Sequence, residues 1–364
     1  MQESEFGSRD SGARYHRQVL LPDFGIAGQK KLGDATVLVV GCGALGCGVA
    51  DLLARAGVGT LRIVDRDVVE ETNLQRQVLF SQADADASRP KAIAAAERLR
   101  AVNPLIDVEP MVADFRAGNA EDIAAGMSLL IDGLDNFESR YLLNDLAVKH
   151  GLPYLYAGAV GTGGMLMPVL PKGGGQGRAI EWAPHQATPC LRCVFPEPPP
   201  AGSTPTCDTA GVLGPTIAAV TAQQAAIALS LLIDRIDGFD RSMHSMNPWT
   251  GEDRRVSTGT PREDCPCCHD RVFDWLDGSR STRDETLCGR NTVQLLPAST
   301  DLVDLAALAA RLAPHGRILC DEHALRVDLN HESVRITVFP DGRALIGVEN
   351  PAQARTLYDR FIGS

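Results

Sequence analysis

The sequence has no surplus of basic residues. Its 364 residues include 35 lysines and arginines against 46 aspartates and glutamates, which gives a formal net charge of −11 at pH 7. Proteins that bind nucleic acids or anionic membranes through charge need a clustered basic surface. The charge balance therefore argues against both partners and favours a small molecule or another protein.

The sequence also lacks a basic leader and a long uninterrupted apolar run. No basic segment followed by an apolar stretch opens the chain, so secretion is not supported and we expect a cytoplasmic protein. The most apolar stretch, residues 212–233, contains Pro215, Gln223 and Gln224, which would be costly in lipid. We therefore predict a buried core helix there and no membrane partner.

Length and composition indicate a globular protein of about two domains, at roughly 100–200 residues each. Hydrophobic residues make up 44% of the chain and charged residues 22%, which is ordinary for such proteins. Strand patterns at 292–296 and 334–339 and helix patterns at 301–312 and 351–362 predict a separate small domain. The expected organisation is a flexible N-terminus at 1–13, a larger domain at 14–270, a linker at 271–285 and a small α+β domain at 286–364.

The larger domain alternates strand and helix patterns. A β-branched apolar run at 36–40 precedes a glycine-rich turn, a helical stretch that ends near Ala56 and a second strand at 61–64. Helical periodicity returns at 91–102, and residues 129–131 predict a further buried strand. This alternation predicts an α/β fold with a doubly wound, Rossmann-like parallel sheet.

A glycine motif lies between the first strand and the first helix. Residues 41–46 are Gly-Cys-Gly-Ala-Leu-Gly, where the first glycine allows a tight turn, the second lets the backbone approach a phosphate and the third permits close helix packing. The N-terminal amides of the helix then face an anion. Asp65, after the second strand, is placed to accept hydrogen bonds from ribose hydroxyls. By itself this motif fits a nicotinamide enzyme as well as a nucleotidyltransferase.

Several further motifs, taken together, are more specific. In chain order they are Arg-Tyr-His-Arg-Gln at 14–18, Asp-Arg-Asp at 65–67, Glu-Glu-Thr-Asn-Leu-Gln-Arg-Gln at 70–77, Arg-Pro-Lys at 89–91, Asp-Gly-Leu-Asp-Asn at 132–136 and Cys-Pro-Cys-Cys at 265–268. Over about residues 14–268 the chain resembles the ThiF/MoeB/HesA adenylyltransferases. It departs from the family pattern at 83–88, where it is longer.

The resemblance implies a role for each motif residue in an attack on the α-phosphate of ATP. Negative charge builds on the phosphate oxygens in that reaction, and preorganised cations stabilise it. Arg76 and Lys91 would supply these cations, Asp135 would hold Mg²⁺, and Arg14 would come from the opposite subunit of a homodimer. Any one of these charges, taken alone, is equally well an ordinary solvated side chain. The nucleotide-binding set that the resemblance implies is Gly41, Gly43, Ala44, Gly46, Asp65, Asp67, Thr72, Asn73, Arg76, Lys91, Asp135 and Asn136.

Ten cysteines in a chain without an export signal indicate metal binding or catalysis more than disulfides. Two Cys-x-x-Cys pairs can offer four thiolates to a structural zinc ion, and many members of the resembled family carry such a zinc at this point. The alternative is a set of thiols without a metal. Cys267 is an extra thiol that could replace a neighbour in the site. The predicted zinc ligands are Cys190, Cys193, Cys265 and Cys268.

Cys207 follows a proline-rich stretch at 196–206, which predicts an extended loop. Its position resembles that of the family's catalytic cysteine, which would form a thioester or a persulfide-derived linkage with the activated substrate. An inert loop cysteine is the alternative, since some members stop at the adenylate. Cys42 and Cys47 are expected to be packing residues, and Cys288 is expected to be a structural thiol, because the anion loop of a rhodanese does not follow it.

The sequence therefore predicts ATP-dependent adenylylation of the C-terminal Gly-Gly carboxylate of a ubiquitin-like sulfur-carrier protein. A cysteine desulfurase or a rhodanese is the expected sulfur donor. One alternative is a non-catalytic scaffold partner of an activating enzyme, although every candidate reactive residue is present. The other is an NAD-dependent oxidoreductase, which has no use for Arg76, Lys91 and Asp135 around phosphates. The sequence does not choose the carrier or the pathway.

Overall fold

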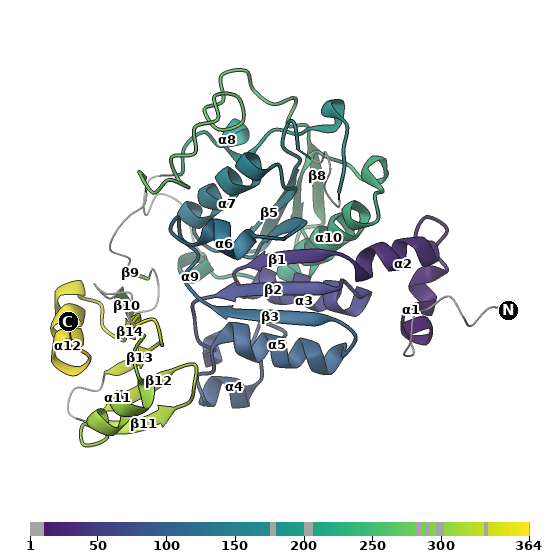
Figure 1. Cartoon of the computed structure of the whole chain (residues 1–364). Helices are drawn as coiled ribbons and strands as arrows, with labels where there is room; N and C mark the ends of the chain where they lie inside the picture. Colours follow the sequence, from purple (N-terminus) through teal and green to yellow (C-terminus); the bar gives the residue numbers. More distant parts are fainter. Residues whose placement is uncertain are drawn as a thin grey trace. The chain divides into compact units, whose positions relative to one another are not determined.

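The computed structural model describes residues 11–174, 180–199, 207–280, 286–287, 292–295, 302–330 and 334–363. The chain forms two compact units (Figure 1). The first comprises Met1–Gln82 and Lys91–Ser281, and the second comprises Ala83–Pro90 and Thr282–Ser364. Residues 1–10, most of the proline-rich stretch (200–206) and Cys288 lie outside the described residues.

The first unit contains an eight-stranded sheet in the order β3-β2-β1-β4-β5-β6-β7-β8. Neighbouring strands from β3 to β5 are parallel, and β6, β7 and β8 extend the sheet with antiparallel pairs. The strands are β1 (Thr36–Val40), β2 (Thr60–Asp65), β3 (Asp107–Val112), β4 (Leu129–Asp132), β5 (Tyr154–Val160), β6 (Gly163–Val169), β7 (Met243–Asn247) and β8 (Glu252–Val256). The predicted parallel sheet is confirmed, and the antiparallel extension adds to it.

Helices cover both faces of this sheet, as the doubly wound prediction requires (Figure 1). Helices α3, α5 and α10 pack together, whereas α6 and α7 pack with each other on the opposite face. The helices of the unit are α1 (Ser11–Val19), α2 (Gly25–Gly33), α3 (Ala44–Ala56), α5 (Lys91–Val102), α6 (Ala120–Ala124), α7 (Phe137–His150), α8 (Leu191–Val194), α9 (Cys207–Ala210) and α10 (Gly214–Leu232).

Burial on both faces explains the continuous apolar run of β1. Leu38 and Val40 belong to the core cluster that includes residues of α6 and α7. Val37 and Val39, which point to the other face because side chains alternate along a strand, are also fully buried. A parallel strand covered by helices on both sides is apolar at every position.

Helix α10 is the core helix predicted at 212–233. By length and composition alone it could cross a membrane, but here it packs on α3 and on strands β5 and β6. Gln224 is fully buried, and its Nε2 donates to the carbonyl oxygens of Asp132 at 3.1 Å and Leu155 at 3.0 Å. The glutamine therefore joins the helix to the ends of two strands.

The second unit is an α+β domain, as predicted. Its six-stranded antiparallel sheet has the order β11-β12-β13-β14-β10-β9, and two helices contribute to its core. The elements are β9 (Thr286–Leu287), β10 (Thr292–Leu295), α11 (Leu305–Leu312), β11 (Gly316–Cys320), β12 (Leu325–Leu329), β13 (Arg335–Val338), β14 (Ala344–Ile346) and α12 (Pro351–Phe361).

Residues 83–90 also belong to the second unit, although they are remote from it in sequence. They contain most of the short helix α4 (Gln82–Asp86). Ser88, which is buried and has a positive φ of 47°, accepts a hydrogen bond at its Oγ from Nη1 of Arg326 in β12. The stretch that departs from the family pattern is therefore part of the C-terminal unit.

Candidate nucleotide site and cysteine cluster

The glycine loop after β1 lies against the turn after β4. A Cβ atom at Gly41 would come within 2.7 Å of the Gly133 carbonyl oxygen, and one at Gly133 within 2.2 Å of the Gly41 carbonyl oxygen. A Cβ at Gly46 would lie 1.9 Å from that same Gly41 oxygen. Only glycine fits where backbones approach this closely. Because β1 and β4 are parallel neighbours, their carboxyl ends meet here, at the edge where α/β sheets bind ligands.

Asp65, the last residue of β2, connects the glycine loop to the following turn. Its Oδ2 accepts the backbone N–H of Cys42 at 2.6 Å, and its Oδ1 accepts that of Asp67 at 2.7 Å. Burial raises the pKa of the Asp65 carboxyl group, and the nearby charge of Lys91 opposes this shift. The carboxylate is thus fixed beside the first helix turn, where an anion would bind.

Lys91 begins α5 and is buried at the same edge. Its Nζ lies 3.2 Å from Oδ2 of Asp67, and its backbone N–H donates to the Asp67 carbonyl oxygen at 2.9 Å. The structure therefore brings together Asp65, Asp67 and Lys91, three of the predicted site residues.

The segment between Asp67 and Lys91 carries Thr72, Asn73 and Arg76. Asn73 is buried in a short 3₁₀ helix (Glu71–Asn73), and its Oδ1 accepts the backbone N–H of Glu70 at 3.0 Å. Arg76 is half-buried, and its Nη1 donates to the Thr72 carbonyl oxygen at 2.9 Å. A guanidinium has five N–H groups, so this bond orients Arg76 without using its capacity for a phosphate.

Asp135 is exposed immediately before α7. Asn136 is the N-cap of that helix, and its Oδ1 accepts the backbone N–H of Ser139 at 2.8 Å. The side-chain nitrogen Nδ2 of Asn136 lies 3.5 Å from Oδ1 of Asp135. Asp135 thus follows the Gly133 turn that touches the glycine loop.

Arg14 and Cys207 have different surroundings. Arg14 is exposed on α1, and its Nη1 donates to the Val102 carbonyl oxygen at the end of α5, at 3.0 Å. Cys207 begins α9, but its side chain is outside what the structure describes. The backbone just after α9 is fixed to the β5–β6 turn, where Gly161 N–H donates to the Gly211 carbonyl oxygen at 2.8 Å.

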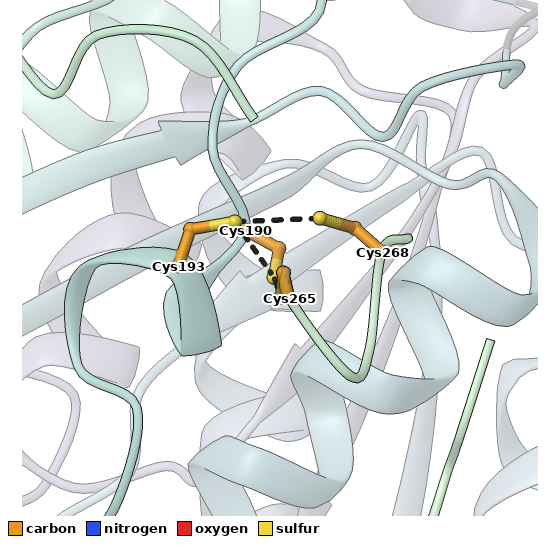
Figure 2. Close-up of side chains that lie close together, drawn as sticks. All are labelled: Cys190, Cys193, Cys265 and Cys268. Atoms are coloured by element: carbon orange, nitrogen blue, oxygen red, sulfur yellow. Dashed lines mark hydrogen bonds between the residues drawn. The ribbon is translucent and has the colours of Figure 1, made fainter. Parts of the chain in front are cut away.

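The four predicted zinc ligands come together at one point (Figure 2). Their Sγ atoms all lie within 4.8 Å of one another, with Cys190 3.8 Å from Cys193 and 3.6 Å from Cys265, and Cys193 3.3 Å from Cys268. Zn–S bonds of about 2.3 Å in a tetrahedron place sulfur atoms about 3.8 Å apart. The geometry and the donor set therefore fit a closed zinc site.

Cys267 lies next to this cluster but outside the four-thiol group. It is fully buried, and its Sγ accepts a hydrogen bond from Nδ2 of Asn144 in α7 at 3.3 Å. Oδ1 of Asn144 in turn accepts the backbone N–H of Leu191 at 2.8 Å. The geometry therefore favours the predicted ligand set and leaves Cys267 outside it.

Arg192, which lies inside the first Cys-x-x-Cys pair, was not predicted from the sequence. Its guanidinium is buried and pairs with Asp274 at 2.7 Å and with Asp145 at 3.5 Å. An arginine between two cysteines that bind a buried metal needs a buried counter-ion. Its position inside the Cys-x-x-Cys pair could therefore have indicated an acidic partner. Arg192 joins the segment after the second cysteine pair to α7.

Comparisons with known proteins agree with the resemblance. The model of the ThiF family matches residues 15–267. The chain is 38% identical over 352 residues to the sulfur carrier protein ThiS adenylyltransferase of Bacillus subtilis (strain 168), covering 96% of this chain and 99% of that protein. It is 39% identical over 261 residues to the adenylyltransferase and sulfurtransferase MOCS3 of Mus musculus, covering 72% of this chain but only 53% of the relative.

Solved structures support the same fold. The crystal structure of E. coli MccB with succinimide has a TM-score of 0.58 and 21% identity, covering 72% of this chain and 75% of that chain. At this identity the likeness concerns the fold alone. The family model covers more than half of the sequence and a relative aligns along nearly all of it, so the chain belongs to the ThiF family.

Proposed function

We propose that this protein uses ATP to adenylylate the C-terminal Gly-Gly carboxylate of a ubiquitin-like sulfur-carrier protein. The observation that carries the proposal is the gathering of the glycine loop, Asp65, the Lys91–Asp67 pair and the Asp135 turn at the carboxyl edge of one parallel sheet. The relatives named as sulfur carrier protein adenylyltransferases support this substrate class. A flexible diglycine tail suits the reaction because it can reach a phosphate through a narrow passage.

The reaction exchanges one bond at the α-phosphorus. A carboxylate oxygen of the carrier forms a bond to this phosphorus, and the bond to the bridging oxygen of the β-phosphate breaks, so pyrophosphate leaves. Lys91 and Arg76 offset the charge that builds on the phosphate oxygens. Each oxygen of Asp65 accepts one backbone N–H and retains a lone pair for a ribose hydroxyl.

Asp135 is the proposed residue for Mg²⁺. It is an exposed carboxylate on a turn that touches the glycine loop, and carboxylate oxygens are suitable ligands for this hard cation. When bound, Mg²⁺ would neutralise phosphate charge. Asn73 and Thr72 would contact the phosphates or the ribose.

Arg14 is proposed to act in the partner subunit of a homodimer. Within one chain its described hydrogen bond is at the end of α5, and it is exposed. An arginine supplied in trans stabilises transition-state charge in other phosphoryl-transfer enzymes. The dimer would thus complete two composite sites.

Cys207 is proposed to act after adenylylation. Its thiolate would attack the acyl carbon, forming a C–S bond while AMP leaves. The persulfide of a cysteine desulfurase or a rhodanese would then displace the Cys207 thiolate from the acyl carbon, and a thiol reductant would cleave the resulting acyl disulfide to leave the thiocarboxylate. We place the whole sequence of steps in the cytoplasm. That compartment is reducing, so the four thiols of the cysteine cluster would remain able to bind zinc.

The decisive experiment is ATP–pyrophosphate exchange with a panel of diglycine-ended carriers. We expect carrier-dependent exchange with at least one of them. If every carrier fails while the protein binds ATP, the adenylyltransferase proposal is wrong and the scaffold alternative returns.

A further inference from the structure

A buried ion pair lies beneath the turn that carries Asp135. Nε of Arg140 is 3.4 Å from Oδ2 of Asp132, and the two side chains are 9% and 0% exposed. The hydroxyl of Tyr154 donates to the same Oδ2 at 2.7 Å. Removing two charges from water is costly, and apolar residues often replace such pairs without loss of stability. The pair therefore needs an explanation other than stability.

The two charged side chains hold two consecutive peptide groups. Oδ1 of Asp132 accepts the backbone N–H of Leu134 at 2.9 Å, and Nη2 of Arg140 donates to the Leu134 carbonyl oxygen at 2.7 Å. The N–H of Leu134 belongs to the peptide plane before this residue, and its carbonyl group belongs to the plane that leads into Asp135. Because peptide planes are rigid, the two bonds fix both backbone torsions of Leu134.

Arg140 also connects this turn to the sheet. The same Nη2 donates to the Ala157 carbonyl oxygen in β5 at 3.1 Å. The guanidinium lies over the rings of Phe137 and Tyr156, at 5.6 and 5.4 Å from their centroids. Arg140 is thus fixed on several sides by residues of α7 and β5.

The chain leaves Asp135 through a second fixed point, the Asn136 N-cap of α7. Asp135 therefore lies between two anchored residues, Leu134 and Asn136, although its own carboxylate is exposed. Such an arrangement reduces the number of directions that this carboxylate can take.

We propose that Asp132 and Arg140 are positioning residues that orient the Asp135 carboxylate toward the magnesium–nucleotide complex. The inference rests on the proposed function, which gives Asp135 the metal. Neither side chain needs to touch the nucleotide. Residues that orient a metal-binding carboxylate typically change metal affinity by about 10- to 100-fold when they are replaced.

The test measures Mg²⁺-dependent binding of a fluorescent ATP, N-methylanthraniloyl-ATP, to the full-length chain without carrier. Mg²⁺ is titrated into chelator-treated samples. Asp132→Asn/Arg140→Met removes both charges and leaves no unpaired ion, so we expect it to fold. The expected result is a Mg²⁺ midpoint raised about tenfold, with nucleotide affinity in chelator unchanged within about twofold. Arg140→Lys, which keeps the charge but loses the forked geometry, should give an intermediate shift.

Tyr154→Phe is the matched control, because it removes a hydrogen bond to Asp132 and leaves the two bonds to Leu134 in place. It should lower thermal stability and keep the parent Mg²⁺ midpoint. An equal midpoint shift in Tyr154→Phe would mean general loosening and would overturn the positioning role.

Asp135→Ala distinguishes the positioning role of Asp132 and Arg140 from the proposed metal role of Asp135. If it raises the midpoint while the folded Arg140 variants do not, the positioning inference is wrong and the proposed role of Asp135 stands. If Asp135→Ala keeps the parent midpoint, or the parent binds the nucleotide without regard to Mg²⁺, the metal role of Asp135 fails and the inference fails with it. Carrier-dependent pyrophosphate exchange by the parent decides the proposed function independently.

Discussion

Nζ of Lys91 lies 3.2 Å from Oδ2 of Asp67, and the lysine side chain is only 2% exposed. The backbone N–H of Lys91 also donates to the Asp67 carbonyl oxygen, so the turn after β2 and the start of α5 are joined twice. A cation held in place before the substrate arrives stabilises charge without reorganisation during the reaction. We infer that Asp67 orients Lys91 for the phosphates.

Lys91→Ala is expected to reduce carrier-dependent ATP–pyrophosphate exchange by about 10²- to 10³-fold, the usual loss for one such contact. Asp67→Asn should lower exchange by a smaller factor, because Lys91 keeps its charge but loses the carboxylate that orients it, and it should also lower the free energy of unfolding. Exchange kinetics and urea unfolding measure the two effects. Asp114→Asn, which breaks the nearby Arg66–Asp114 pair at 2.9 Å, is the control and should leave exchange near the parent rate.

Arg76→Ala and Asp135→Ala should each strongly reduce exchange while the fold remains intact. Both groups act on charge that develops in the transition state, so each loss should cost about 10²- to 10³-fold in rate. Circular dichroism and thermal unfolding check the fold. Near-parent exchange in either variant would contradict its place in the site.

The sequence predicts the glycine-loop region well because its signals are local. The apolar run of β1 and the glycine spacing appear as β1 (Thr36–Val40) and α3 (Ala44–Ala56) at the predicted positions. Helix α7 (Phe137–His150) was not predicted, because its own side chains are buried around the whole helix and so give no amphipathic pattern. Its buried Arg140, Asn144 and Asp145 look like surface residues in the sequence and acquire their roles only from tertiary partners.

Two further features could be assigned only from the three-dimensional structure. The Cys-x-x-Cys spacing predicts Cys268 as a zinc ligand but leaves Cys267 open as a replacement. The structure decides this point, because Cys267 meets Asn144 of α7 and lies outside the four-thiol group. The assignment of residues 83–90 to the C-terminal unit depends on contacts between segments far apart in the chain. The extra length at 83–88 was visible in the sequence, but the contact of Ser88 with Arg326 was not.

Mixed dimers test the source of Arg14. Neither an Arg14→Ala chain nor an Asp135→Ala chain should be active alone, but their mixture should recover activity, because one composite site regains both groups. Exchange is measured after subunit mixing, with differently tagged chains purified as verified heterodimers. Absence of recovery in those heterodimers would exclude supply in trans.

The cysteine cluster should hold one tightly bound zinc per chain in protein purified without chelator. Cys265→Ser should lose the metal and lower the thermal unfolding temperature, because structural zinc contributes folding free energy. Cys267→Ser is the matched control, since Cys267 is equally buried and adjacent but lies outside the four-thiol group; it should retain the metal. Elemental analysis and calorimetry measure both, and a zinc-free parent protein would remove the assignment.

The C-terminal unit is expected to dock the carrier or a downstream acceptor, by analogy with domains appended to larger ubiquitin-activating enzymes. Deleting residues from Thr286 onward should leave carrier-independent ATP binding nearly intact and weaken turnover with the carrier or acceptor. Binding titrations and steady-state kinetics with both partners measure this. A folded truncated protein with full-length kinetics would rule out docking.

The truncation also removes Arg326, the hydrogen-bond partner of Ser88, and Lys91 follows the 83–90 segment directly. A truncated chain could therefore be slow because its lysine is displaced and not because a docking surface is lost. Arg326→Ala in the full-length chain isolates the first effect. Arg335→Ala is its matched control, because Arg335 pairs with Asp328 at 2.7 Å, and Asp328 also pairs with Arg326. We expect both variants to retain parent turnover with the carrier. If Arg326→Ala alone reproduces the defect of the truncated protein, the unit acts through residues 83–90 and the docking proposal is wrong.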